Sequence, residues 1–219
     1  MTSLSAIATA LSLKSLFSTR EQLEKLCGAE LADRLLSDSS ENGNIERILN
    51  VMKEKDVKGA FFVLDHLIID NTELVKRMAD EGHLVCNHTK SHKNMARVTD
   101  YNEFVSETAG LEEIYKEYTG REMSKYFRPP EGSYSEQMLK FCNESGLTPV
   151  FWSFAYADWD NNNQMSAEKA FEKITSNLHN GMVMLLHPTS ATNVAVLDRV
   201  LTYIEEQGYR FGTLDELKL

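Results

Sequence analysis

Short apolar runs that alternate with longer helical patterns are the feature of this sequence that most constrains its fold. A continuous apolar run is typical of a parallel strand buried on both faces, and strands alternating with helices of ten or more residues predict parallel β-α units. The chain has no glycine-rich phosphate loop, which favours a (β/α) barrel over a dinucleotide-binding sheet. The predicted strands are 59–64, 83–88, 126–128, 149–154, 181–186 and 209–213, and the predicted helices are 45–55, 71–82, 101–118, 135–146, 167–178 and 194–206.

Length and charge set broad limits on the function. At 219 residues, the chain has the size of a single α/β barrel domain. The formal net charge of −10 and the lack of a Lys/Arg cluster exclude a nucleic-acid partner, because binding phosphates requires clustered positive charge. No apolar run is long enough to span a bilayer, so no integral membrane segment is expected.

The cysteines and the first residues leave the compartment open. Cys27, Cys86 and Cys142 are widely spaced and match neither a zinc pattern nor a disulfide framework. Residues 4–13 have the apolar character of a secretion signal, but a basic start is lacking and the first lysine is Lys14.

Isolated polar residues follow four of the predicted strands. His88 and His92 come after one strand, and Arg128, Asp158 and His187 come after three others. In a barrel of parallel strands, the carboxyl ends meet on one face, and catalytic groups gather on the loops there. The sequence therefore predicts that these five side chains converge.

The stretch 87–92 holds two histidines four residues apart, which we predict to lie in a helical turn after the strand. Residues at this spacing share one helix face, so both imidazoles would reach one cation. A neutral imidazole is the commonest metal ligand, and a catalytic site keeps a free position for water beside three protein ligands. His66, His83 and His179 are assigned structural or surface roles.

Each polar residue also has a structural interpretation. Arg128 would brace a loop before two prolines, Asp158 would belong to a solvated acidic turn, and His187 would be a satisfied core histidine. Taken singly, these alternatives are as plausible as the functional ones. They require all three residues to fall at strand ends by accident.

Four separated stretches resemble motifs of the polysaccharide deacetylases, the NodB-homology family also known as carbohydrate esterase family four. They occur in the family's order over residues 40–215, and agreement of four is far more specific than agreement of one. The stretches that most resemble the branch that de-N-acetylates muramic acid during delta-lactam formation are Glu41-Asn42-Gly43, Arg128-Pro129-Pro130 and Phe151-Trp152-Ser153. The four family motifs are Asn87–His92 for the metal motif, Arg128–Gly132 for Arg-x-Pro-x-Gly, Asp158-Trp159 for Asp-Trp, and Leu185–Pro188 for Leu-x-His.

The resemblance implies a distorted (β/α) barrel that hydrolyses an acetamide on an amino sugar. It also implies a divalent metal, namely zinc, with cobalt or manganese as alternatives. His187 would protonate the departing amine, since an imidazole titrates near neutral pH, and Asp158 would hold His187 in one tautomer. In the family, the residue matching Arg128 contacts the carboxylate base. The resemblance also places Pro129, Trp159 and Leu186 at the substrate.

The family's first motif, which supplies a base and a metal-binding aspartate, is degenerate in this chain. An ungapped alignment from Glu41 puts Ser37 at the base position and Asp38 at the metal position. Residues 29–36, expected as the first barrel strand, have a helical pattern instead. We therefore divide the chain into a divergent segment, 1–36, and a barrel domain, 37–219.

Three alternatives remain open for this motif. Asp38 is the third metal ligand, in a protein without the usual base; or a one-residue gap makes Asp38 the base; or the motif is lost and the domain binds sugar without cleaving it. Serine cannot replace a carboxylate base, whose assistance is typically worth about a hundredfold to ten-thousandfold.

The leading hypothesis is a metal-dependent de-N-acetylase acting on amino sugars of peptidoglycan or a related polysaccharide, with Asp38, His88 and His92 as metal ligands. One alternative is a catalytically impaired relative that binds cell-wall glycan, and another is an unrelated metallohydrolase built on the two histidines. An extracytoplasmic or cell-wall location follows from the expected substrate. The exact sugar and the oligomeric state stay undetermined.

Overall fold

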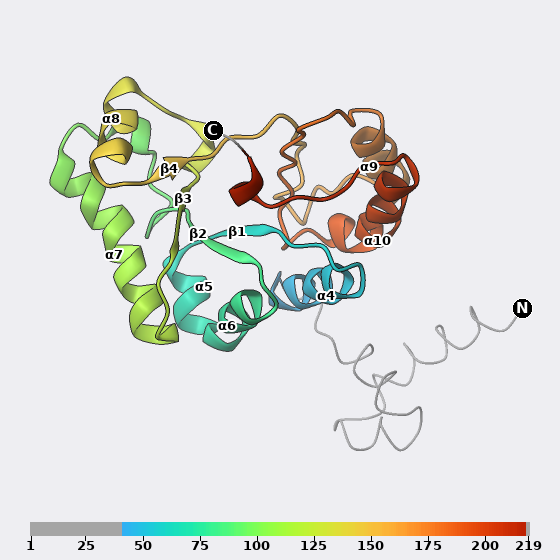
Figure 1. The fold of residues 1–219 in the computed structure, drawn as a ribbon, viewed down its shortest axis with the longest axis horizontal. Helices are drawn as coiled ribbons and strands as arrows, with labels where there is room; N and C mark the ends of the chain where they lie inside the picture. Colours follow the sequence, from blue (N-terminus) through green and yellow to red (C-terminus); the bar gives the residue numbers. More distant parts are fainter. Residues whose placement is uncertain (1–40, 218–219) are drawn as a thin grey trace, which may run out of the picture.

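The computed structural model describes residues 41–217 and contains one parallel sheet (Figure 1). Its order is β1-β2-β3-β4, so each strand lies beside the next strand along the chain. The register pairs Val63 with Asn87, Asn87 with Phe127, and Phe127 with Pro149. All four strands therefore end at the same level of the sheet. The strands are β1 (Ala60–Val63), β2 (Leu84–Asn87), β3 (Ser124–Phe127) and β4 (Thr148–Pro149).

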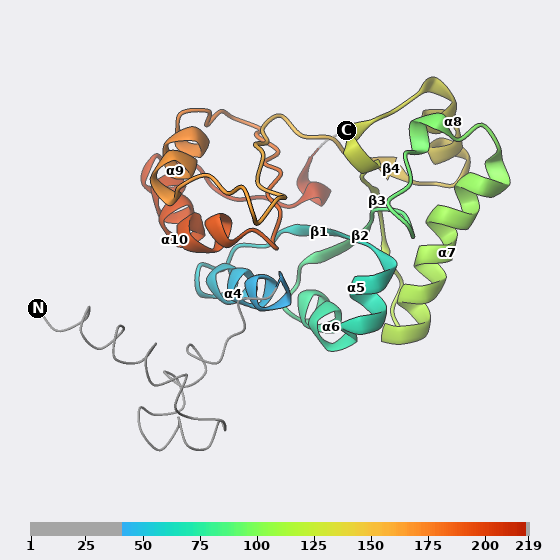
Figure 2. The ribbon, with the colours of Figure 1, turned by 180° about the vertical axis from the view of Figure 1, so that it is seen from behind.

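Helices follow the strands and surround the sheet. Figures 1 and 2 show α7 and α8 at the β3–β4 end, and α9 and α10 at the other end, with α4, α5 and α6 between them. The helices are α4 (Glu41–Glu54), α5 (Asp65–Asp70), α6 (Thr72–Asp80), α7 (Tyr101–Thr119), α8 (Glu136–Glu144), α9 (Ala167–Thr175) and α10 (Ala191–Glu206), and the short 3-10 turns are η1 (Met95–Arg97), η2 (Pro130–Gly132) and η3 (Leu214–Glu216).

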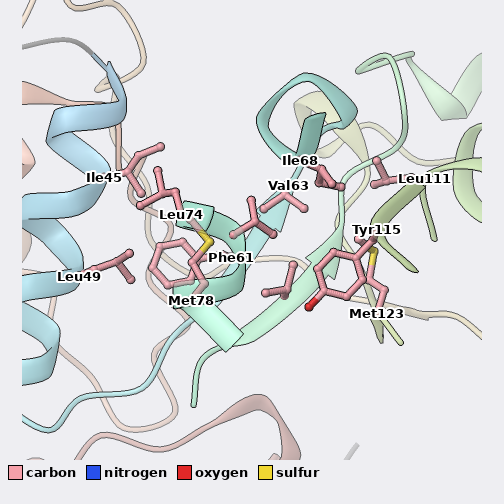
Figure 3. Packing of buried hydrophobic residues seen from close by; sticks show 12 residues of the cluster. Ile45, Leu49, Phe61, Val63, Ile68, Leu74, Met78, Leu111, Tyr115 and Met123 are labelled. Atoms are coloured by element: carbon pink, nitrogen blue, oxygen red, sulfur yellow. The ribbon is translucent and has the colours of Figure 1, made fainter. Parts of the chain in front are cut away.

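The first half of the described chain has a core between β1, β2 and the helices α4, α6 and α7 (Figure 3). Phe61 and Val63 point into it from alternate positions of β1, while Leu49 of α4 and Val75 of α6 are fully buried against them. Burying one such side chain contributes about 1.5–3 kcal/mol relative to leaving it exposed. The apolar faces of these helices therefore keep β1 and β2 in place.

All six helices predicted within residues 41–217 are present, and α5 is an additional helix. The helix ends follow sequence signals in the clearest case, α7, where the Asp100 side chain accepts a hydrogen bond from Glu103 N and Gly120 adopts a left-handed conformation with φ of 72°. These local signals determine helix ends without help from distant residues.

Three of the predicted strands differ from the structure. Segment 181–186 has a single parallel bridge, between Met184 and Phe154, and within the predicted strand 149–154 only Pro149 belongs to β4. Segment 209–213 pairs with no described strand, because Tyr209 and Phe211 pack through their side chains on the α9–α10 cluster instead. A ladder needs a partner of matching length on at least one side, and the described residues supply only a short one here.

Several sequence predictions lie outside the described residues. These are the division at residue 36, the apolar stretch 4–13, Cys27, Ser37 and Asp38. Between residues 41 and 217, no helix combines the length and apolar character needed to cross a bilayer.

Candidate active site

The common level at which the strands end places His88 and Arg128 side by side. His88 follows Asn87, the last residue of β2, and Arg128 follows Phe127, the last residue of β3. The Arg128 backbone N–H donates to the Asn87 carbonyl over 2.9 Å. A backbone hydrogen bond between the ends of β2 and β3 therefore brings the first two of the predicted polar residues together.

The chain after β2 does not form the helical turn predicted for residues 87–92. Thr89 and His92 have φ of 68° and 57°, values that break a right-handed helix. The His88 and His92 rings nevertheless lie 5.0 Å apart between centroids, edge to face at 80°. The two imidazoles meet through a tight loop with left-handed residues, so the expected proximity is confirmed while the helical explanation is wrong.

Side chains that sequence reasoning did not single out hold this loop. Asn87 is fully buried, and its side chain donates to the Thr108 carbonyl over 2.9 Å and accepts from Thr89 N over 2.9 Å. The Glu107 carboxylate accepts from the Ser91 backbone N–H and hydroxyl at 2.9 and 2.8 Å. Asparagine at the end of a strand is a known turn signal, so Asn87 was detectable; Glu107 was not, because it lies on α7.

His88 has one ring nitrogen committed to the protein. Its Nδ1–H donates to the Arg128 carbonyl over 2.7 Å, which leaves Nε2 unprotonated in the neutral ring. Burial first, and then the Arg128 charge, lower the pKa of His88 to about 3. A neutral imidazole oriented by a carbonyl is the form in which histidine binds metals.

Arg128 is held between the sheet and the His88 loop. Its guanidinium lies 4.8 Å from the centre of the Phe62 ring, an attractive cation–π distance. Burial lowers the pKa of Arg128 to about 10, while the negative charge of Asp158 opposes that shift. An arginine with this pKa stays charged at neutral pH and provides a fixed positive charge at the rim.

His187 is oriented by a carboxylate. Its Nδ1–H donates to Asp158 Oδ1 over 2.6 Å, and its backbone N–H donates to Asp158 Oδ2 over 2.7 Å. Asp158 is 1% exposed, and Asn193 Nδ2 donates to Asp158 Oδ2 over 2.6 Å. The Tyr156 hydroxyl donates in turn to Asn193 Oδ1. This chain fixes the tautomer of His187 and leaves its Nε2 for a substrate.

Asn193 and Tyr156 were missed from the sequence, although each had a signal. Tyr156 stands two residues before Asp158, and Asn193 lies in the first turn of α10, where short polar residues favour capping. Burial raises the pKa of the Tyr156 hydroxyl, which keeps it protonated as a donor.

The three predicted substrate residues lie in different surroundings. Trp159 is 62% exposed, with its ring centre 6.4 Å from that of His187. Pro129 is buried at the start of η2, and its carbonyl accepts from Gly132 N over 3.0 Å. Leu186 is half-buried and lines a cavity of about 710 Å³ between β1 and segment 181–188, together with Arg128 and His187.

The described residues alone do not complete a metal site. Between residues 41 and 217, no group of three or more His, Cys, Asp or Glu side chains is arranged to hold a metal ion. The donor set nevertheless fits a cation in part, because His88 and His92 face each other and His88 is neutral. The third predicted ligand, Asp38, lies outside the described part of the chain.

A parallel α/β fold, with two facing histidines and an aspartate-oriented histidine at one rim, defines the class as a deacetylase-type barrel hydrolase. The polysaccharide deacetylase family profile matches residues 35–150. A similar protein is the peptidoglycan-N-acetylmuramic acid deacetylase PdaA of Bacillus subtilis, 39% identical over 81% of this chain and 67% of its own length. The chain therefore belongs to the polysaccharide deacetylase family.

Solved structures agree with this assignment. The structure of Bacillus subtilis PdaA, a family 4 carbohydrate esterase, superposes with a TM-score of 0.75 at 36% identity over 78% of this chain and 73% of that chain. A family 4 pseudoenzyme from Bacillus anthracis superposes with a TM-score of 0.73 at 26% identity, covering 80% of this chain and 60% of that chain. These matches confirm the barrel class predicted from the sequence.

A further relative acts on the other amino sugar of peptidoglycan. The peptidoglycan-N-acetylglucosamine deacetylase of Bacillus cereus is 33% identical over 78% of this chain and 62% of its own length. The chain thus spans about two thirds or less of the curated relatives described here.

Proposed function

We propose that this protein hydrolyses the N-acetyl group of amino sugars in peptidoglycan, in a reaction that depends on a divalent metal. The observation that carries the proposal is the meeting of two organised histidine systems at one rim. The His88 and His92 rings lie 5.0 Å apart, the Arg128 carbonyl accepts from His88 Nδ1–H, and Arg128 lines the same cavity as His187. The names of PdaA and of the Bacillus cereus enzyme supply the substrate class.

The roles follow from the hydrogen bonds. His88 and His92 would hold zinc, cobalt or manganese, which supplies a polarised carbonyl and an activated water when bound. His187 presents Nε2 to the substrate and delivers a proton to the leaving amine, while Asp158 stabilises its charged form. Arg128 contributes a fixed positive charge that favours a carboxylate beside it.

The start of α4 supports Asp38 as the third ligand. Asn44, in the first turn of α4, donates from Nδ2 to the Thr189 carbonyl over 2.7 Å, and Thr189 is two residues beyond His187. Asp38 is three residues before Glu41, the first residue of α4, and three residues span at most about 11 Å. The first turn of α4 therefore lies close to the segment that carries His187.

Acetate release tests the proposal. The full chain, stripped with a chelator, should release no acetate from N-acetylated peptidoglycan strands, and added zinc or cobalt should restore release. The double variant His88→Ala/His92→Ala should stay inactive with metal, whereas His66→Ala, which alters an exposed histidine, should behave as the wild type. Release that survives the chelator and the double variant contradicts the metal-dependent mechanism.

A second candidate function is glycan binding with impaired turnover. It is favoured by the serine that alignment places at the base position, Ser37, and by the similarity to the pseudoenzyme from Bacillus anthracis. A mutant of that pseudoenzyme has restored enzymatic activity. Ser37→Asp should therefore raise acetate release, by up to about a hundredfold to ten-thousandfold. Full wild-type turnover with no gain in Ser37→Asp would remove this candidate.

The expected location follows from the substrate. The relatives are named for action on peptidoglycan, a polymer outside the cytoplasmic membrane. We infer that this protein acts outside the membrane or at the cell wall. Fractionation of cells that produce the full-length protein tests this location.

A further inference from the structure

Two aromatic side chains stand out by their exposure. Tyr134 is 63% exposed and Trp159 is 62% exposed, the highest values among the exposed large apolar and aromatic side chains of residues 41–217. Single exposed aromatics are common, but these two both lie on loops at the rim that carries the histidines. Trp159 is near His187, and Tyr134 follows the Arg128 loop.

Tyr134 is backed by a second aromatic residue. Its ring lies 5.3 Å from that of Phe151 at 70°, a favourable edge-to-face arrangement. Phe151 is 37% exposed and follows β4, the strand beside β3. Because β3 and β4 end at the same level, the pair forms a small apolar surface at the same rim as Arg128, defined here as the Tyr134–Phe151 platform.

The loop that carries Tyr134 is held without using the tyrosine ring. Gly132 has φ of 66°, and a Cβ there would stand 2.5 Å from Trp152 Cη2, so Trp152 packs directly on the loop backbone. Asn94 Nδ2 donates to Glu131 Oε2 over 2.7 Å, which joins this loop to the one that follows His92. Immediately after Tyr134, Ser135 caps α8 by accepting from Met138 N. The loop is thus fixed next to the histidines, while the tyrosine ring stays available.

We propose that the Tyr134–Phe151 platform is a sugar subsite, where a pyranose ring next to the one being deacetylated stacks on Tyr134. This inference rests on the proposed function, since that function brings a glycan strand across the rim. A pyranose ring has an apolar C–H face and a polar edge, which matches an exposed phenol ring with a hydroxyl at its tip. Trp159 then contacts the strand near His187, and Tyr134 contacts it beside the ends of β3 and β4.

The carboxylates that flank Tyr134 in the sequence disfavour an acidic partner at the platform. Glu131 and Glu136 flank Tyr134 in the sequence, both are exposed, and the whole chain carries a net charge of −10. A carboxylate-bearing stem peptide, or the lactyl carboxylate of N-acetylmuramic acid, would be repelled there, whereas the uncharged N-acetylglucosamine ring would not. The occupant is therefore a sugar ring of the strand rather than an acidic stem peptide.

Length-dependent binding tests the subsite without relying on turnover. Calorimetry would compare peptide-free peptidoglycan strands of six or more sugars with the N-acetylglucosamine–N-acetylmuramic acid disaccharide. We expect the wild type to bind the long strand more tightly, and Tyr134→Ala to reduce that preference about tenfold. Tyr134→Phe keeps the ring and should retain most of the preference.

A matched control comes from the opposite end of the barrel. Tyr118 is 39% exposed near the end of α7, just before the chain enters β3, so Tyr118→Ala removes an exposed tyrosine far from the rim and should bind as the wild type does. Equal length preference in Tyr134→Ala and wild type overturns the subsite, as does a wild type that binds both glycans equally. Strand binding that depends on Tyr134 without any acetate release overturns the proposed function instead and leaves the subsite in place.

Discussion

His83 and His88 lie at the two ends of the same strand, β2, and both are buried, at 5% and 8% exposure. At the amino end, the Gly59 backbone N–H donates to His83 Nδ1 over 3.1 Å, so the proton of the neutral ring is on Nε2. At the carboxyl end, His88 Nδ1–H donates to the Arg128 carbonyl, so Nε2 carries the lone pair. The two histidines therefore have opposite tautomers.

The surroundings of the second nitrogen decide what each histidine can do. His83 Nε2 is buried and has no hydrogen-bond partner among the described residues, and the His83 ring packs against Phe61 at 5.2 Å. His88 has His92 as its ring neighbour, in a loop held by Asn87. Burial alone thus does not indicate a functional histidine; the position of the free lone pair does.

The largest expected effect comes from removing His88, the histidine at the carboxyl end of β2. His88→Ala should lower zinc affinity and acetate release by more than about a hundredfold, because loss of an outer partner of a metal ligand already costs about 10- to 100-fold. Thermal unfolding of the metal-free protein should change little by comparison. Isothermal titration with zinc would measure the zinc affinity, and an acetate assay would measure the acetate release. Unchanged zinc affinity would contradict the assignment of His88 as a ligand.

The second effect concerns the other oriented histidine at the rim. Asp158→Asn should lower kcat by about a hundredfold to ten-thousandfold, because the amide cannot stabilise a charged His187. Zinc affinity should stay close to that of the wild type. A fall in kcat with KM and the circular dichroism spectrum close to those of the wild type would distinguish this role from a general loss of structure.

A third effect concerns the stability contributed by His83, the histidine at the amino end of β2. His83→Ala should reduce the free energy of unfolding by about 1–3 kcal/mol, because the Gly59 N–H loses its buried acceptor and the ring leaves a space beside Phe61. Urea unfolding would measure the loss. His83→Asn serves as the control, since its side-chain carbonyl offers an acceptor, and zinc binding in both variants should match the wild type.

The smallest effect is a pH dependence of stability. Burial lowers the pKa of His83; the positive charges of Lys58 and Arg77 lower it further, and Glu81 opposes them. Above the ordinary histidine pKa of about 6.5, both folded and unfolded chains are neutral there and His83 contributes no pH dependence. Below pH 6.5 the unfolded chain binds a proton at His83 more readily than the folded chain does, so the free energy of unfolding decreases as the pH is lowered. Urea midpoints at pH 7 and pH 5 should fall less in His83→Asn than in the wild type, and an equal fall in both proteins would exclude His83.

Much of this organisation was predictable from the residues. The alternation of apolar runs and helical patterns predicted the parallel sheet and all the helices except α5, and spacing at strand ends predicted that His88, His92, Arg128, Asp158 and His187 gather. These features depend on local burial patterns and on one general property of parallel sheets, namely that their carboxyl ends meet on one face.

Other features depended on contacts between distant residues. The sequence did not predict the left-handed turn at Thr89 and His92, since the loop is held by Thr108 and Glu107 from α7. It also missed Asn193, which reaches Asp158 from a position 35 residues away. The predicted strand 181–186 became a single bridge because its pairing depends on neighbours that periodicity does not specify.

The sequence by itself determined which chemical groups lie at the ends of strands, because each strand and the residue that follows it are neighbours in the sequence. Only the tertiary structure decided which nitrogen of each histidine is free. That choice depends on whether a distant backbone group donates or accepts, as Gly59 N–H does for His83 and the Arg128 carbonyl does for His88.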